Sequence, residues 1–165
     1  MSIYCKHIIF CYRLCRHLDK IHADSVICRK VLRVIIFMLY FYYGSLAKIL
    51  YGAFLPYKAT IGNRVNFVHS LHGIFISQSA VIGDDCIILH HVTIGSDVPI
   101  DGRSNTSKAP VIGNIVFIGC NTSIIGMVEV GDDSRIGAGV TLANKIIKPK
   151  STVVSSSNRV IARDE

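Results

Sequence analysis

Four histidines, His69, His72, His90 and His91, are the side chains best suited to acid–base chemistry in this sequence. His69 and His72 fall in residues 68–75 (VHSLHGIF), a segment three residues longer than the repeat around it. A neutral imidazole can take the proton of a hydroxyl group while that oxygen attacks an electrophile. Functional residues are often found where a loop interrupts a regular pattern. His69 is therefore a candidate functional residue, and an ordinary surface-loop histidine is the alternative.

Cysteine side chains could form disulfides, bind a metal or act as nucleophiles, but the spacing of the cysteines favours none of these roles. The six cysteines form no CxxC pair, and no secretory signal with a cleavage site precedes them, so reduced cytosolic thiols are expected. Cys11 and Cys15 lie near His7 and His17, yet their spacing does not match structural zinc sites, and we predict no metal. Cys120 has no obvious partner base, so a nucleophilic role is disfavoured.

A strict repeat must position these residues. From Val111 to Ile147, aliphatic residues recur every six positions without a slip: Ile112, Ile118, Ile124, Val130, Ile136 and Leu142. A period of six fits neither a helix nor a simple strand. It indicates a solenoid, in which each repeat forms one face of a three-sided coil. Ordinary sandwich strands are the alternative, but they vary in length and alternate with period two.

The repeat also predicts which residues point inward. The aliphatic residue should stack on its counterpart in the next coil, and the small or β-branched residue four positions later should fill the remaining interior. The glycine that follows most of the aliphatic residues is expected to turn the corner, since glycine tolerates positive φ. Earlier repeats start at Ile61 and Phe67 and resume at Ile76, and a polar segment at 95–110 should loop out.

The N-terminal part has a different character. Apolar residues at helical spacing predict helices over residues 3–20 and 24–50, which divides the chain into a helical segment (1–54) and a β domain (55–165). Residues 1–58 carry nine Lys or Arg and two Asp, a net charge of +7, whereas residues 59–165 carry nine of each sign. The uncharged run 34–47 is shorter than the ~18–20 residues that span a bilayer. We expect it to pack over the open solenoid end with some peripheral membrane contact.

Four stretches resemble the hexapeptide-repeat acyltransferases: HSLHGIFIS at 69–77, HHVTIGS at 90–96, APVIG at 109–113 and IGAG at 136–139. Within these enzymes the chain looks most like the serine acetyltransferase group and its short relatives that O-acetylate surface sugars. The resemblance implies a mainly β fold, a left-handed parallel β-helix, assembled as a homotrimer. It further implies acetyl-CoA as acyl donor, bound between subunits. The cysteine usage predicts a cytoplasmic enzyme, and the basic N-terminal segment would hold it at the inner face of the membrane.

The same resemblance assigns residues. It implies that His69 is the catalytic base and that His72 and His90 contact the acceptor. The cofactor contacts of the family fall on Ser96, Gly119, Cys120, Arg135, Gly137 and Ala138. A basic charge without interleaved aromatic residues gives little support for nucleic-acid binding.

Two departures from true serine acetyltransferases bear on the acceptor. Where those enzymes have the aspartate that pairs with the base, this chain has Phe54. Where they have the second active-site histidine, it has Ala109. The loss of a carboxylate that would recognise an ammonium group favours a sugar hydroxyl of a surface polysaccharide or its precursor. Serine O-acetylation for cysteine biosynthesis is the nearest alternative. A trimeric zinc hydratase and a non-catalytic hexapeptide scaffold are weaker ones.

Overall fold

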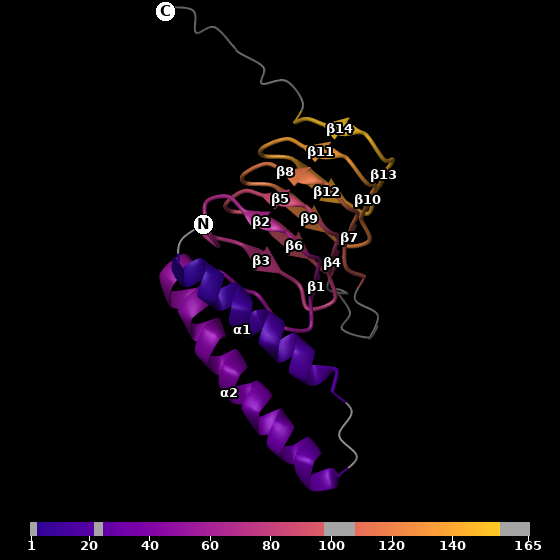
Figure 1. Cartoon of the computed structure of the whole chain (residues 1–165). Coiled ribbons are helices and arrows are strands. Elements are labelled where there is room, and N and C mark those ends of the chain that lie inside the picture. Colours follow the sequence, from indigo (N-terminus) through magenta and orange to yellow (C-terminus); the bar gives the residue numbers. More distant parts are fainter. Residues whose placement is uncertain (1–2, 22–24, 98–107, 156–165) are drawn as a thin grey trace, which may run out of the picture.

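The protein is a helical hairpin followed by a parallel β-solenoid of about five turns (Figure 1). The structure is a computed structural model that describes residues 3–21, 25–97 and 108–155. Helix α1 spans Ile3–Asp19 and helix α2 spans Val26–Tyr51. Both predicted helices are present, and their ends lie within two residues of the expected positions. The predicted loop 95–110 lies mostly outside the described residues.

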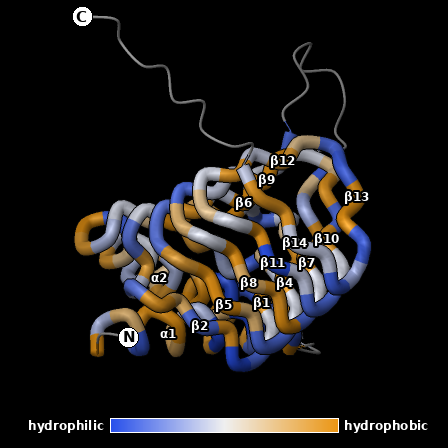
Figure 2. Tube along the Cα trace, turned by 90° about the horizontal axis from the view of Figure 1, so that it is seen from above, coloured by the Kyte–Doolittle hydropathy of each residue, from blue (hydrophilic) through white to orange (hydrophobic). Residues whose placement is uncertain are grey.

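Short strands stack into three parallel sheets, one for each face of the coil. The first sheet contains β1 (Thr60–Ile61), β4 (Val81–Ile82), β7 (Val111–Ile112), β10 (Glu129–Val130) and β13 (Ile146–Ile147). The second contains β2 (Asn66–Phe67), β5 (Ile87–Ile88), β8 (Phe117–Ile118), β11 (Arg135–Ile136) and β14 (Thr152–Val153). The third contains β3 (Phe75–Ile76), β6 (Thr93–Gly95), β9 (Ser123–Ile125) and β12 (Thr141–Ala143). Seen from above, successive coils run parallel to one another as a stepped stack (Figure 2).

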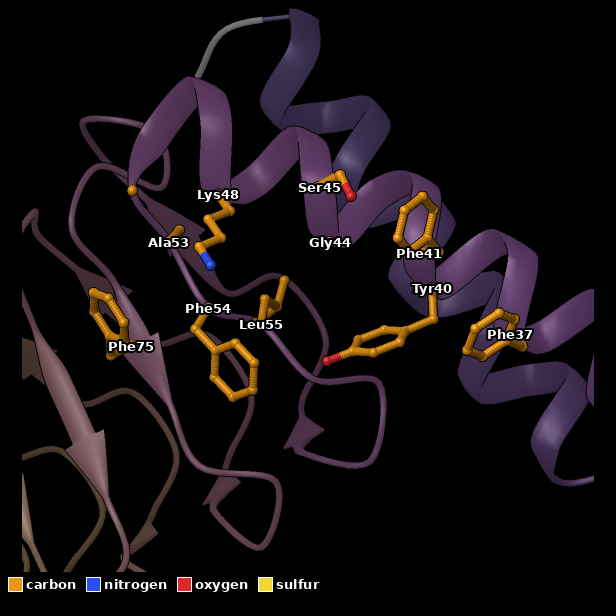
Figure 3. Close-up of a pocket in the computed structure, with 11 residues that line it drawn as sticks. Phe37, Tyr40, Phe41, Gly44, Ser45, Lys48, Ala53, Phe54, Leu55 and Phe75 are labelled. Carbon is orange, nitrogen blue, oxygen red and sulfur yellow. The ribbon is translucent and has the colours of Figure 1, made fainter.

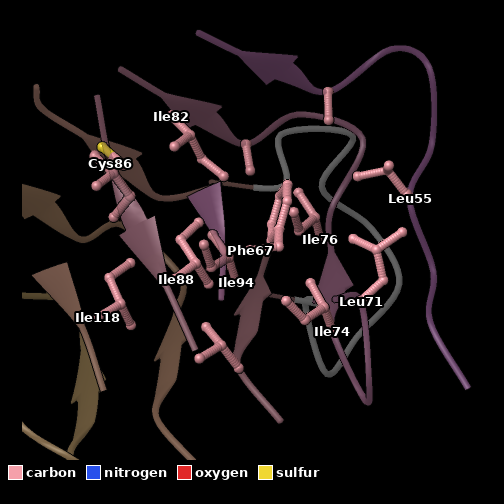
Figure 4. Close-up of a cluster of buried hydrophobic side chains, with 14 of the residues drawn as sticks. Leu55, Phe67, Leu71, Ile74, Ile76, Ile82, Cys86, Ile88, Ile94 and Ile118 are labelled. Atoms are coloured by element: carbon pink, nitrogen blue, oxygen red, sulfur yellow. The ribbon is translucent and has the colours of Figure 1, made fainter. Parts of the chain in front are cut away.

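The hexad aliphatics form the interior, as predicted. Ile82, Ile88, Ile94 and Ile118 are at most 1% exposed and point into one continuous cluster (Figure 4). Neighbouring coils place identical positions side by side, for example Ile88 against Ile118. The side chain of each is therefore removed from water by the coils above and below, and this burial is the main favourable contribution to stability.

The repeat ends differently from the prediction. Ile146 was expected to fill the interior but is 74% exposed, because Ile147, not Ile146, pairs with Val130 and takes the inward position. The spacing from Leu142 to Ile147 is five residues, so the register slips once here. The solenoid then continues one strand beyond Ile147, since β14 pairs with β11.

The expected role of the repeat glycines was wrong. Positive φ values occur instead at residues such as Arg64, Asp85 and Asp133, two positions after a repeat glycine. The glycines are needed because consecutive coils approach closely. A Cβ atom on Gly83 would lie 2.6 Å from the carbonyl oxygen of Gly113, which no side chain could tolerate without a backbone shift.

The helical hairpin closes the open end of the solenoid. The hydroxyl of Tyr12 on α1 donates a hydrogen bond to the carbonyl oxygen of Ala59 (2.7 Å), and the hydroxyl of Tyr43 on α2 donates to that of Leu55 (3.2 Å). The Arg13 guanidinium donates to the carbonyl oxygen of Gly62 (3.0 Å). These helix side chains thus donate to carbonyl groups at the edge of the first coil, which would otherwise accept hydrogen bonds from water or from another strand. The expectation that the helices pack over this end is confirmed.

Candidate active site

The candidate site lies along one edge of the prism, where the chain passes from the second sheet to the third. We call this edge the histidine corner and define it as residues 68–74, 89–92, 119–122 and 137–140, one segment in each successive coil. Backbone hydrogen bonds link these segments, including His91 N–H to the carbonyl oxygen of His72 (2.8 Å) and Gly139 N–H to that of Cys120 (2.9 Å). The corner is therefore a rigid strip built from sequence-distant pieces.

Three imidazoles meet in the lower two coils. The ring centroids of His69 and His90 are 5.1 Å apart, and those of His90 and His91 are 5.4 Å apart. His69 is exposed, so its ring is open to an approaching acceptor. The Nδ1 atom of His90 is buried and has no hydrogen-bond partner among the described residues. A buried N–H without a partner would be costly, so the neutral ring of His90 should carry its proton on Nε2, which is then its hydrogen-bond donor.

His72 has a different place in the cluster. Its Nδ1–H donates a hydrogen bond to the carbonyl oxygen of His69 (2.8 Å), and its ring packs edge-on against Tyr51, with centroids 4.9 Å apart. Tyr51 is the last residue of α2. His72 therefore fixes the loop that carries His69 and ties it to the helical hairpin. Its Nε2 remains available for the acceptor contact that the sequence predicts.

The upper part of the histidine corner holds most of the predicted cofactor residues. Gly119 and Cys120 follow β8, and Gly137 and Ala138 follow β11 in the next coil. A Cβ atom on Gly119 would lie 2.5 Å from the backbone nitrogen of Ala138, so the two coils touch here and only glycine fits. Arg135 lies exposed on β11, two residues before this strip. The structure thus aligns these five residues above the histidines.

Ser96 is not on this strip. It follows β6 at the edge between the third and first sheets, where its hydroxyl accepts a hydrogen bond from that of Ser77 (3.1 Å). Ser96 and Phe54 both line a groove of about 340 Å³ along the outer side of the third sheet, together with Phe75, Gln78 and Thr93. Within one chain, the third sheet therefore separates Ser96 from the histidines.

Sequence reasoning missed three residues near this site. Tyr51 supports His72, and Gly73 lies so close to His91 that an added Cβ would be 2.2 Å from its Nδ1. Phe75 forms the groove with Phe54, to which it is bridged in the sheet. Tyr51 and Phe75 carry no spacing signal. Gly73 could have been found, because a glycine directly after a histidine inside the break in register is unusual for this repeat.

Within residues 3–21, 25–97 and 108–155, no group of three or more His, Cys, Asp or Glu residues is arranged to hold a metal ion. The four histidines discussed above are instead engaged in ring contacts and a hydrogen bond to backbone. A hydratase-type zinc centre therefore receives no support from the part of the chain that the structure describes.

Thiol reactivity should follow burial. We expect iodoacetamide at pH 8 to label Cys28 first, because Cys28 is exposed, whereas burial raises the pKa of Cys5, Cys86 and Cys15, the last to about 11. Only about one Cys15 thiol in a thousand is then ionised at pH 8, and the thiolate is the reactive form. Mass spectrometry of tryptic peptides gives the labelling order, with guanidinium-unfolded protein as control. Equal rates for Cys15 and Cys28 in the folded protein would contradict this packing of the hairpin.

The chain is similar in sequence to known acetyltransferases. Residues 109–144 match the family described as bacterial transferase hexapeptide (six repeats). The chain is 34% identical over 122 residues to serine acetyltransferase of Mycobacterium tuberculosis, covering 74% of this chain and 51% of that protein. It is 30% identical over 158 residues to serine acetyltransferase of Helicobacter pylori, covering 96% of this chain and 81% of that protein.

Solved structures show the same fold. Serine acetyltransferase from Vibrio cholerae superposes with a TM-score of 0.72 at 25% identity, over 100% of this chain and 57% of that one. The Brucella abortus enzyme in complex with coenzyme A gives 0.70 at 25% identity, over 100% and 58%. The chain thus spans little more than half of these proteins. Its repeats and its near full-length match to the Helicobacter pylori protein place it in the serine acetyltransferase family of hexapeptide-repeat transferases.

Proposed function

We propose that this protein transfers the acetyl group of acetyl-CoA to the hydroxyl of serine, with His69 as general base. The near full-length match to the Helicobacter pylori serine acetyltransferase is the main support for this reaction and this acceptor. This order reverses the expectation from the sequence, which placed a sugar acceptor first. The matched proteins named above are all serine acetyltransferases, and they support serine better.

The chemistry needs one proton acceptor and one anion site. The acceptor oxygen attacks the thioester carbonyl, its C–O bond forms, and its proton passes to the exposed ring of His69. The C–S bond then breaks, and the proton goes on to the departing CoA sulfur, which leaves as free thiol. The ring of His90 lies beside that of His69, and its Nε2–H would be a suitable donor to the acceptor or to the developing oxyanion.

The cofactor would lie along the strip above the histidines. Gly119, Cys120, Gly137 and Ala138 present backbone and small side chains there, which leaves room for an extended thioester arm. Arg135 is exposed at the end of this strip and suits a phosphate. No described carboxylate lines the neighbouring groove that holds Ser96. A homotrimer would bring the Ser96 edge of one copy to the histidine corner of the next, which is why we propose a trimer with three shared sites.

A sugar hydroxyl is the second candidate acceptor. It is favoured by the groove beside the site, where Phe54 replaces a carboxylate and the described lining contains Phe75, Ser77, Gln78 and Thr93 but no Asp or Glu. Among these described residues the ammonium group of serine finds no counter-charge, whereas an uncharged ring with hydroxyl groups needs none.

Acceptor competition tests both candidates. The purified full chain is incubated with acetyl-CoA and either L-serine or a panel of hexoses and N-acetylhexosamines, and mass spectrometry measures free CoA and the acetylated product. We expect O-acetylserine as the main product. Product formed only from a sugar would replace serine by the second candidate. Release of CoA without either product would contradict both acceptors.

A further inference from the structure

Helix α2 has one side that the rest of the described chain leaves uncovered. Ile36, Tyr43 and Ala47 on its inner side are buried against α1 and the solenoid. On its outer side, six apolar residues are between 54% and 80% exposed: Ile27, Val31, Val34, Met38 and Phe41, which are three or four residues apart, and Ile49, about two turns further on. We call these six residues the outer stripe. Exposed apolar residues in such a continuous row mark a binding surface rather than chance exposure.

The apolar surface extends from the outer stripe toward the solenoid. Phe41 also lines a groove of about 590 Å³ between α2 and the first coil, with Phe37 on the helix and Phe54 and Phe75 on the other wall (Figure 3). Lys48 is the one charged residue of this groove. The uncovered apolar area is therefore wider than the stripe alone.

Positive charge flanks the outer stripe. Lys30 and Lys48 are exposed at one border of the stripe, and neither forms an ion pair within the described part of the chain, whereas Arg29 and Arg33 lie toward α1, where they line a groove with Leu18, Asp19 and Ile36. Helix α2 contains no acidic residue. Long basic side chains can place their charges at the level of lipid phosphates while their methylene groups cover apolar surface.

The apolar stripe and the positive charge beside it together indicate what binds to this side of α2. We infer that the outer stripe of α2 docks on the surface of an anionic lipid bilayer, with Lys30 and Lys48 at the headgroups. A second copy of the chain is a poorer fit, because pairing two α2 helices would bring like charges together with no acidic residue to offset them. A bilayer offers apolar depth and negative charge on the same face.

The helix lies on the bilayer and does not cross it. By length and composition α2 is the one helix among the described residues that could span a membrane. Its inner side, however, is fixed to protein through the hydrogen bond from Tyr43 to Leu55 and through packing on α1. Only the outer stripe is free for lipid, so an in-plane position is the one that the packing allows.

The membrane contact would place the candidate site near the headgroups. Helix α2 ends at Tyr51, whose ring contacts His72, and His72 holds the carbonyl oxygen of His69. This inference stands apart from the choice of acceptor, because it rests on the outer stripe and the charges of α2 and not on how the groove lined by Phe54 and Phe75 holds an acceptor.

Vesicle co-sedimentation of the full chain tests the inference. The probes are vesicles of phosphatidylcholine alone and of phosphatidylcholine mixed with phosphatidylglycerol, at low and high salt. We expect binding to the anionic vesicles, weakened by salt. The double variant Lys30→Glu, Lys48→Glu should bind roughly thirty-fold more weakly, from about fivefold per basic residue lost. Its matched control is Lys145→Glu, Lys148→Glu at the far end of the solenoid.

A second pair of variants tests the apolar part. Met38→Ser with Phe41→Ser should also release the protein from vesicles, while Ile146→Ser, an exposed apolar residue of the last coil, should not. Circular dichroism verifies that each variant is folded. The inference is overturned if the wild-type chain ignores anionic vesicles or if the control variants lose binding equally. It is also overturned if Met38→Ser with Phe41→Ser abolishes self-association instead, because the occupant is then a second copy.

Discussion

The variant His69→Ala should lose acetyl transfer by a factor of about 10²–10⁴ in kcat, the usual contribution of a positioned general base. The loss should fall on kcat, with little change in the KM for acetyl-CoA, because the predicted cofactor strip lies in the coils above His69. Steady-state kinetics that follow free CoA measure both constants. The imidazole of His69 is exposed and makes no side-chain hydrogen bond within the described chain, so its removal should leave the fold intact.

His17→Ala is the matched control for this prediction. His17 is also exposed, but it lies in the last turn of α1, away from the histidine corner, and its removal should leave kcat unchanged. If His69→Ala keeps wild-type kcat, His69 is not the base, and another residue must take the proton. If both variants lose activity together, the effect reports folding, which the melting temperature of each will show.

The largest effect on stability should come from the solenoid interior. Ile118→Ala removes a fully buried side chain at the centre of the second sheet, between β5 and β11. Such truncations lower the free energy of unfolding by about 2–5 kcal/mol, because burial is lost and a cavity remains. For a chain of this size the melting temperature should fall by very roughly 5–15 °C, as measured by calorimetry.

Ile146→Ala makes the same chemical change at a site that is 74% exposed. It should alter the free energy of unfolding by less than about 0.5 kcal/mol, as is usual for surface substitutions. Because Ile118→Ala and Ile146→Ala remove the same atoms, the difference between their effects on the free energy of unfolding isolates burial as the cause. A cost at Ile118 no greater than that at Ile146 would mean that the interior is not packed as described.

The sequence predicted the fold well because the repeat is itself the structural constraint. A side chain that recurs every six residues, as Ile112, Ile118 and Ile124 do, leaves few architectures in which all copies are equivalent. The helices were predictable from their apolar spacing. The slip at Ile147 was not, because the residues Ile146 and Ile147 are chemically alike and only strand pairing decides which one turns inward.

The sequence could not predict why the repeat glycines are needed, nor which residues surround His69. Both depend on distances between residues of different coils, such as Gly83 with Gly113 and His69 with His90. Spacing along the chain gives the coil to which a residue belongs, but not how close two coils come at a corner. The acceptor was predictable only as a class, since it depends on side chains such as Phe54 and Phe75 whose common groove appears only in three dimensions.

The hydrogen bonds from Tyr12, Arg13 and Tyr43 to the first coil give the solenoid a closed end. A stack of parallel strands can in principle grow by recruiting identical strands, as fibrils do. Here the lower face is occupied by the molecule's own helices, so no foreign strand can be templated there. A chain that began after Tyr51 would lose this protection, and we would expect it to polymerise through its bare lower coil even though every residue of the repeat was still present.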